Sequence, residues 1–187
     1  MIDISSHDPD RADGPVAAGR RLALDRASQL WNERTADDPR AEDERFIALL
    51  DSLLADGGDG APVTDLDPSV VADLITGLQQ RRLRDTAAEY IRPSELDRAR
   101  ALWALLARHR DPADLQSAVP LLTLAGYTAL VAGERPVAAA LLGQARAADP
   151  DYLLAELLAE LVATGAPVDR LIADCEAERA ARLARRT

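Results

Sequence analysis

Lysine is absent from this sequence, and cysteine and aromatic residues are scarce. All 22 basic residues are arginine, a bias that high-GC codon usage produces. The single cysteine, Cys175, excludes an intramolecular disulfide, and its neighbours Leu171 and Ile172 predict a small buried hydrophobe in preference to a reactive thiol. Aromatic residues make up 3% of the chain, which disfavours a β-rich fold.

Long apolar runs and recognisable targeting segments are also missing. No uninterrupted apolar stretch reaches the roughly 18 residues that a membrane-spanning helix needs, and the first residues lack the basic and apolar regions of a signal peptide. We therefore expect a cytoplasmic protein. The net charge of -10 argues against binding to nucleic acid or to an anionic membrane surface.

Motifs of metal, nucleotide and hydrolase sites are not found in the sequence. It has no Cys/His cluster, HExxH, GxGxxG, Walker A or GxSxG element. Of the two histidines, His7 lies in the acidic N-terminal segment and His109 lies at a predicted helix end, where a cationic side chain suits the helix dipole. We predict no catalytic residue, no metal site and no cofactor. A deep pocket in which acidic side chains converge on His109 would instead indicate an enzyme.

Alanine, leucine and valine supply most of the hydrophobic residues, which form 48% of the chain. Alanine and leucine favour helices, and apolar residues recur at helical spacing along most of the sequence. A length of 187 residues fits one domain. The sequence thus predicts an all-α fold of antiparallel helical hairpins, because the predicted helices are joined by loops of a few residues.

Local composition sets the expected boundaries. Residues 1–15 are acidic and contain few apolar side chains, which predicts a disordered segment ahead of a helical domain over 16–187. The Asp- and Gly-rich stretch 56–64 predicts a flexible break, since it lacks the ligand spacing of an EF-hand. We expect helices over 16–33, 40–55, 68–91, 94–109, 119–132 and 136–148, and two more that begin near 149 and 167.

Proline and capping residues place several of these boundaries. The pairs at 67–68 and 149–150 each match an aspartate N-cap followed by proline in the first helical position. Ser94 and Asp97 fit a capping box. Pro120 cannot donate a backbone hydrogen bond, so we expect a short turn of helix and then the main helix of this region from about residue 119.

One hairpin resembles a tetratricopeptide repeat. Gly126, Gly133, Ala138 and Ala145 fall at positions where that repeat places small residues for close helix contacts, and the pair at 149–150 would begin the next unit. The usual tryptophan and tyrosine positions of the first helix hold a leucine and an alanine here. Since a solenoid needs about three copies, the resemblance implies a TPR-like second half and not a peptide-binding array.

A second resemblance covers residues 45–173. The segments ALLDSLLADG, VVADLITGLQQRRLRDTAAEYI and AVPLLTLAGYTALVAGERPVAAALLGQARAADPDYLLAELLAELVATGAPVDRL are similar to the C-terminal helical half of the actinobacterial family DUF4192, a domain of unknown function. Members usually carry an α/β portion ahead of this half. The sequence shows no strand-rich region, which implies that any activity seated in that portion is absent. The resemblance implies a helical fold and brings no established function.

The densest basic feature of the ordered part is Arg81, Arg82 and Arg84, which are our candidate partner-binding residues. An anion or an acidic peptide could bind them. Alternatively, Arg81 forms an i,i+4 pair with Asp85, and Arg84 joins Asp85 in a network that bridges helices.

The last turns of the final helix carry Arg179, Arg182, Arg185 and Arg186. Interaction with the helix dipole explains these arginines without a partner. A helix that projects beyond the domain could instead present them, with Leu183, to another protein.

These patterns favour a non-catalytic helical domain that acts as a scaffold or regulatory partner of another protein. The alternative is an accessory or remnant domain of an enzyme whose catalytic part is on another chain. Self-association as a homo-oligomer is a third hypothesis. A concave apolar surface between the hairpins would favour protein binding.

Overall fold

The computed structural model describes residues 15–55, 63, 66–110 and 114–185. Every regular element in these ranges is an α-helix, so the predicted all-α class is confirmed. The segment predicted to be disordered, 1–15, lies outside the described residues except for its last position, where the first helix begins. The helices are α2 (Pro15–Asp37), α3 (Pro39–Leu54), α4 (Pro68–Gly77), α5 (Arg81–Ala87), α6 (Pro93–His109), α7 (Leu115–Val131), α8 (Arg135–Ala148), α9 (Leu153–Thr164) and α10 (Asp169–Ala184).

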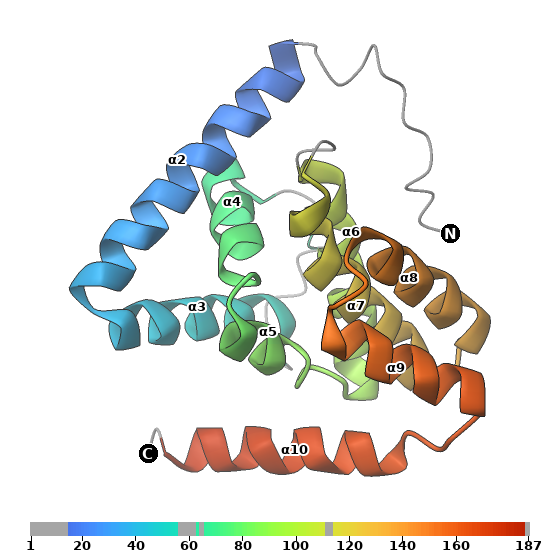
Figure 1. The fold of residues 1–187 in the computed structure, drawn as a ribbon. Helices are drawn as coiled ribbons and strands as arrows, with labels where there is room; N and C mark the ends of the chain where they lie inside the picture. Colours follow the sequence, from blue (N-terminus) through green and yellow to red (C-terminus); the bar gives the residue numbers. More distant parts are fainter. Residues whose placement is uncertain (1–14, 56–62, 64–65, 111–113, 186–187) are drawn as a thin grey trace.

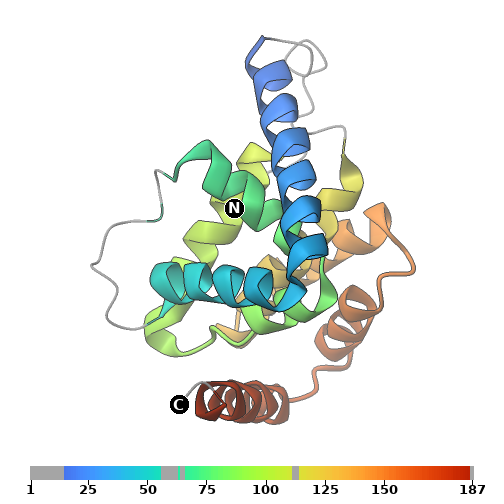
Figure 2. The same ribbon diagram turned by 90° about the vertical axis from the view of Figure 1, so that its left-hand side faces the viewer.

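The helices form two packed groups that share α6 and α7. In the first group, α2 and α3 meet at a corner, and α4 packs on α2 (Figure 1). In the second group, α7 packs between α6 and α8, and α9 packs on α8. Helix α10 runs along one end of the molecule in both ribbon views (Figures 1 and 2). This last helix covers the end at which the two groups meet.

The corner between α2 and α3 is set by Asp38 and Pro39. Asp38 has extended backbone angles and its carboxylate accepts hydrogen bonds from the backbone N–H groups of Arg40 (3.1 Å) and Ala41 (3.0 Å). Proline at the first helical position keeps the preceding residue out of the helical region. The chain therefore ends α2 and begins α3 at one residue, although α2 continues four residues beyond its predicted end at 33.

The prediction of one helix over 68–91 was wrong, because the chain forms α4 and α5 with a break at Leu78–Gln80. Gly77 ends α4 against the ring of Phe46, and a Cβ at this position would lie 2.3 Å from that ring. The backbone then tightens, with hydrogen bonds from Gln79 N to Thr76 O and from Gln80 N to Gly77 O. The apolar side chains on both sides of the break enter the same core. Apolar spacing therefore continues across the break and conceals it.

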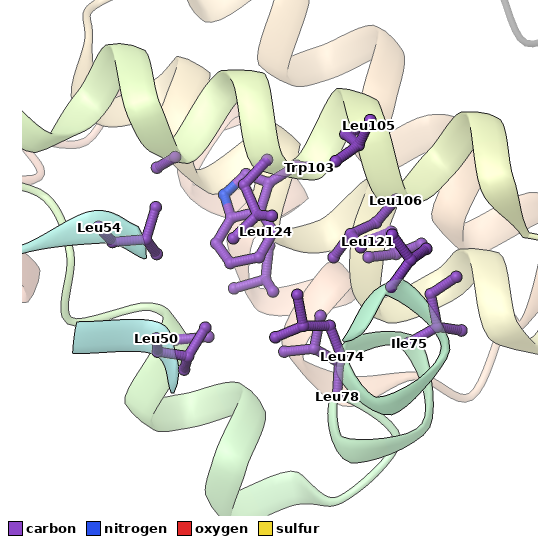
Figure 3. Close-up of a cluster of buried hydrophobic side chains, with 14 of the residues drawn as sticks. Leu50, Leu54, Leu74, Ile75, Leu78, Trp103, Leu105, Leu106, Leu121 and Leu124 are labelled. Carbon is purple, nitrogen blue, oxygen red and sulfur yellow. The ribbon is translucent and has the colours of Figure 1, made fainter. Parts of the chain in front are cut away.

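The larger core lies between α2, α3, α4, α5, α6 and α7. Trp31 and Phe46 meet edge to face, with their ring centroids 5.7 Å apart, and the indole N–H of Trp103 donates to Thr128 Oγ1 at 3.2 Å. Burial of a leucine side chain contributes about 1.5–3 kcal/mol. Figure 3 shows the leucines that converge from α3, α4, the break after α4, α6 and α7: Leu50, Leu54, Leu74, Leu78, Leu105, Leu106, Leu121 and Leu124.

The second core joins α7, α8 and α9, and small residues allow the close approach that the sequence predicts. A Cβ at Gly126 would lie 2.8 Å from Leu142 Cγ, so α8 packs directly on the α7 backbone. Ala138 and Ala145 on α8 are fully buried. Gly133 follows α7 with a φ of 79°, a left-handed conformation that glycine adopts without a steric penalty.

Helix α7 begins at Leu115, four residues before the predicted start. The carboxylate of Asp114 accepts from the backbone N–H of Ser117 at 3.1 Å and caps the helix. Pro120 lies inside the helix and removes the hydrogen bond to the carbonyl of Gln116. Gln116 is exposed, so water can satisfy that carbonyl. The N-cap therefore outweighs the proline.

Two other predicted helix starts differ in detail. The cap of α6 is the carboxylate of Glu95, which accepts from the backbone N–H of Arg92 at 3.2 Å, and not the predicted pair Ser94 and Asp97. Helix α9 begins at Leu153, because the aspartate–proline pair at 149–150 forms a turn in place of a first helical turn.

The predicted flexible break at 56–64 falls almost entirely outside the described residues. Val63 is the exception. Its side chain is buried and belongs to the larger core. The segment between α3 and α4 is therefore anchored to the domain at this position.

Candidate functional site

The three candidate arginines on α5 do not form a common surface. Arg81 is largely exposed, and its Nε lies 3.7 Å from Asp85 Oδ2, which confirms the predicted i,i+4 pair. Arg82 forms an ion pair with Asp43 of α3. Arg84 is buried. Each guanidinium thus pairs with an intramolecular carboxylate, and Arg81 and Arg84 share Asp85. Partner binding by these residues stays a prediction.

Arg84 connects α5 to the chain between α8 and α9. Its Nε and Nη2 donate to Asp85 Oδ1 at 3.0 and 2.6 Å, and its Nη1 donates to the Tyr152 hydroxyl at 2.6 Å. The guanidinium carbon also lies 5.2 Å from the centre of the Tyr152 ring. Burial lowers the pKa of Arg84, but these hydrogen bonds outweigh that effect and the net pKa is raised. The alternative prediction of a network that bridges helices is therefore confirmed.

The most enclosed group of charges lies beneath the second half of α10. Arg179 Nη1 is 2.7 Å from Glu95 Oε1 and 2.8 Å from Glu95 Oε2. The Glu95 side chain has no exposed surface, and that of Arg179 is 7% exposed. The Arg179 guanidinium carbon lies 4.7 Å from the centre of the Tyr90 ring. One arginine thus combines a buried ion pair with a cation–π contact.

Arg182 lies one helical turn further along α10 and binds a second carboxylate. Its Nε donates to Glu89 Oε2 at 2.9 Å and its Nη2 lies 2.8 Å from the same oxygen. Its Nη1 is 4.0 Å from Asp51 Oδ2, and Asp51 accepts from the Tyr90 hydroxyl at 2.5 Å. We call the set Asp51, Glu89, Tyr90 and Glu95 the carboxylate recess.

Electrostatics in the carboxylate recess favour occupation by cations. Burial raises the pKa of the Glu89 carboxyl, and the hydrogen bond from Arg182 offsets this only in part. Burial would lower the pKa of Arg182, but its hydrogen bond to Glu89 outweighs burial and the net pKa is raised. Buried ion pairs are costly to separate, because removal of one member leaves an uncompensated charge.

The structure corrects the interpretation of the C-terminal arginines as dipole partners. Arg179 and Arg182 bind carboxylates on other elements, whereas Arg185 is exposed and Arg186 lies outside the described residues. The sequence carries a signal for this difference. Arg179 and Arg182 continue the spacing of Ile172 and Cys175, at intervals of three or four residues, and so extend the apolar face of α10.

A second charge cluster joins α2, α3 and α4. Glu42 is buried and accepts from Arg34 Nε and from Arg45 Nε, each at 3.0 Å. Asp73 of α4 pairs with the same two arginines at 2.9 and 3.1 Å. Burial favours the neutral form of Glu42, but hydrogen bonds from Arg45 and Arg34 outweigh it and lower the pKa. These four charges fasten the corner between α2 and α3 to α4.

His109 lines an apolar pocket of about 260 Å³ between α2, α4 and the end of α6. Its Nδ1 lies 2.9 Å from the carbonyl oxygen of Leu105 in the last turn of α6, as the capping interpretation predicts. The other described residues that line the pocket are Gly19, Ala23, Leu24, Pro68, Val71 and Ala72. None of these lining residues is acidic. A general acid–base pair would need such a second group.

Cys175 is half-buried on α10 and packs against the second core. Its Sγ lies 3.3 Å from the Tyr127 hydroxyl, and burial raises the pKa of the thiol. Within the described ranges, no group of three or more His, Cys, Asp or Glu side chains is placed to hold a metal ion. In the same ranges, none of the helices is long and apolar enough to cross a membrane.

Comparison with known proteins gives one match. The model of the family described as "Domain of unknown function (DUF4192)" matches residues 2–168. No curated protein and no solved structure matches the chain. The match includes α2 and the start of α3, which the resemblance over 45–173 left out, and it ends one residue before α10. The chain belongs to the DUF4192 family.

Proposed function

We propose that this chain is a helical interaction domain that binds another protein and performs no chemistry of its own. The observation that supports this proposal is the way in which α10 binds the carboxylate recess. All four residues of the carboxylate recess lie within the part that matches the family, whereas the helix that occupies the recess begins at Asp169, beyond the match. The part of the chain that matches the family therefore binds a helix that follows the match, through paired buried charges.

The arrangement of the second half supports the same proposal. The close contact at Gly126 and the buried alanines of α8 have the packing that a TPR-like hairpin needs, and TPR-like modules present helix surfaces to partners. We also propose, as the sequence leads us to expect, that the protein is actinobacterial and cytoplasmic. The second candidate function is an accessory domain of an enzyme on another chain. It differs from the first in that the partner is an enzyme, and the experiment below distinguishes the two.

The test compares full-length baits in a lysate of the source organism. Arg179→Gln/Arg182→Gln opens the recess, and Glu89→Gln/Glu95→Gln removes two of its carboxylates. The matched control is Arg170→Gln/Arg185→Gln, which removes the same charge from exposed positions of α10. Circular dichroism first establishes that each bait is folded.

We expect one protein to be retained in stoichiometric amount by the open-recess bait and lost from the carboxylate variant, and a complex to re-form from the two purified proteins. A partner with a catalytic site would select the accessory-domain alternative. Absence of any stoichiometric protein from every bait would contradict an interaction function. Arg81→Glu, in the same series, tests the α5 arginines without disturbing buried Arg84.

A further inference from the structure

We propose, on the basis of the interaction function above, that the carboxylate recess recognises a helix carrying two arginines three residues apart. Helix α10 is then an internal occupant that a partner helix with the pattern Arg-x-x-Arg displaces. The partner is a separate protein that presents such a helix. The proposal rests on how the recess is built, on its preference for arginine and on how weakly the second half of α10 is otherwise attached.

The recess is assembled by three separate parts of the domain. Asp51 comes from α3, Glu89 and Tyr90 from the connection after α5, and Glu95 from α6. Three of its members are held in place by contacts with residues outside α10. The Tyr90 hydroxyl donates to Asp51, and Glu95 accepts from the backbone N–H of Arg92. The site is therefore preorganised for its occupant, which reduces the cost of binding.

The contacts are specific for the guanidinium group. Arg179 stacks over the Tyr90 ring while its Nη1 contacts both oxygens of Glu95. Arg182 reaches the same oxygen of Glu89 through Nε and Nη2. A lysine ammonium lacks the planar face that Arg179 places over Tyr90, and it lacks the two nitrogens that Arg182 places near Glu89.

The contacts described for the second half of α10 are made mainly by its two buried arginines. Its buried side chains are Arg179 and Arg182, whereas Leu183 is 43% exposed. The first half is attached by partly buried apolar side chains, Leu171, Ile172 and Cys175. The second half can therefore leave while the first half stays packed, and the core side chain that Arg179 covers is the Tyr90 ring.

The internal occupant is also imperfectly matched to the recess. Arg179 Nε is buried and has no hydrogen-bond acceptor among the described residues. A buried donor without an acceptor costs about 1–3 kcal/mol. A partner helix that provides this acceptor, or that places its guanidinium groups slightly differently, would gain that free energy and displace α10.

The direct test uses the full chain and a labelled peptide of residues 169–187, which carries both arginines. Fluorescence anisotropy measures binding to the open-recess variant Arg179→Gln/Arg182→Gln and to the wild type. We expect at least ten-fold tighter binding to the open-recess variant, because the tethered α10 competes at high effective concentration in the wild type. Addition of Glu89→Gln and Glu95→Gln to the open-recess variant should weaken binding at least ten-fold.

Three peptide variants test the arginine pattern. Arg179→Gln/Arg182→Gln and Arg179→Lys/Arg182→Lys should each bind at least ten-fold more weakly than the native peptide. Arg170→Gln/Arg185→Gln has the net charge of the first variant and should bind like the native peptide. If the quadruple protein variant does not fold, Glu89→Gln alone in the open-recess background provides the comparison.

Equal binding of all the peptides, or binding unchanged by loss of the carboxylates, would overturn the proposal. A wild-type mass of twice the chain in light scattering, lost in Glu89→Gln/Glu95→Gln, would assign the recess to α10 of a second copy and contradict a separate partner. The peptide experiment tests the chemistry of the recess, and the lysate experiment tests the interaction function, so a negative result in one does not imply a negative result in the other. If a lysate protein is retained while no peptide binds the recess, the interaction function stands and the arginine-helix chemistry is wrong.

Discussion

Arg179 and Glu95 are 84 positions apart in the sequence, yet Arg179 Nη1 lies 2.7 Å from Glu95 Oε1. This buried pair joins α10, which follows the family match, to α6, which lies within it. Since a buried charge is stable in a protein only when it is paired, the contact fixes where α10 docks. It also makes both residues sensitive to substitution.

Glu95→Ala should destabilise the protein by about 3 kcal/mol, because it leaves the Arg179 charge buried without its carboxylate. Glu95 also caps α6, so the single variant does not isolate the pair. A double-mutant cycle with Arg179→Met in urea denaturation separates the two effects. We expect a coupling free energy of at least about 1 kcal/mol, and additive single effects within about 0.5 kcal/mol would contradict the buried pair.

Gly126→Ala should destabilise the protein by about 1–3 kcal/mol, since the new methyl group overlaps Leu142 and forces α7 and α8 apart. The matched control is Gly143→Ala on α8, where a Cβ meets nothing within 4 Å. Because alanine favours a helix over glycine by up to about 1 kcal/mol, the control should be neutral or stabilising. Thermal unfolding of the two variants checks the contrast, and equal effects would refute the close packing.

Acidification should remove stability through Glu42. Burial opposes ionisation of this carboxyl, but hydrogen bonds from Arg45 and Arg34 outweigh burial and hold its pKa below the ordinary value of 4.5. The Glu42 carboxylate therefore binds a proton more readily in the unfolded chain than in the folded protein. Its contribution to the free energy of unfolding is present above pH 4.5 and is lost as pH falls through the lower pKa of the folded state. Urea denaturation of Glu42→Gln from pH 7 downward should show a shallower loss of stability than the wild type. An identical pH slope in the two proteins would contradict this role.

The thiol of Cys175 should react slowly in the folded protein. Burial raises its pKa, and alkylating reagents attack the thiolate. With a single cysteine in the chain, the rate of iodoacetamide labelling reports on this site alone. We expect a rate at least ten-fold below that of the urea-unfolded chain at the same pH. Equal rates would show that the first half of α10 is not packed against the second core.

Helical periodicity predicted the elements of the fold but not all of their ends. The helices expected over 40–55 and 136–148 agree with α3 and α8 within one residue. The division of 68–91 into α4 and α5 depends on the contact between Gly77 and Phe46, which are 31 positions apart. Local sequence does not contain that contact. Propensity and spacing could therefore predict that helices form here, and only tertiary packing decides where they break.

The carboxylate recess was missed for a related reason. Its acids come from separate elements, and each one has a local explanation as a cap or a solvated charge. The alternative prediction for Arg84 was correct because Asp85 is adjacent in sequence, whereas Tyr152 is a long-range partner that spacing could not supply. The recess was visible in sequence only as two arginines on an apolar helix face. Long-range ion pairs require the fold before they can be assigned.

Hydrogen exchange of the backbone amides in residues 176–184 tests most directly whether the carboxylate recess holds the second half of α10. In Glu89→Gln/Glu95→Gln, we predict exchange at least ten-fold faster than in the wild type across this segment, with α7 and α8 unchanged. Arg170→Gln/Arg185→Gln should exchange at the wild-type rate. Unchanged protection of residues 176–184 in the carboxylate variant would contradict the account, because α10 would then be held by contacts other than its buried arginines.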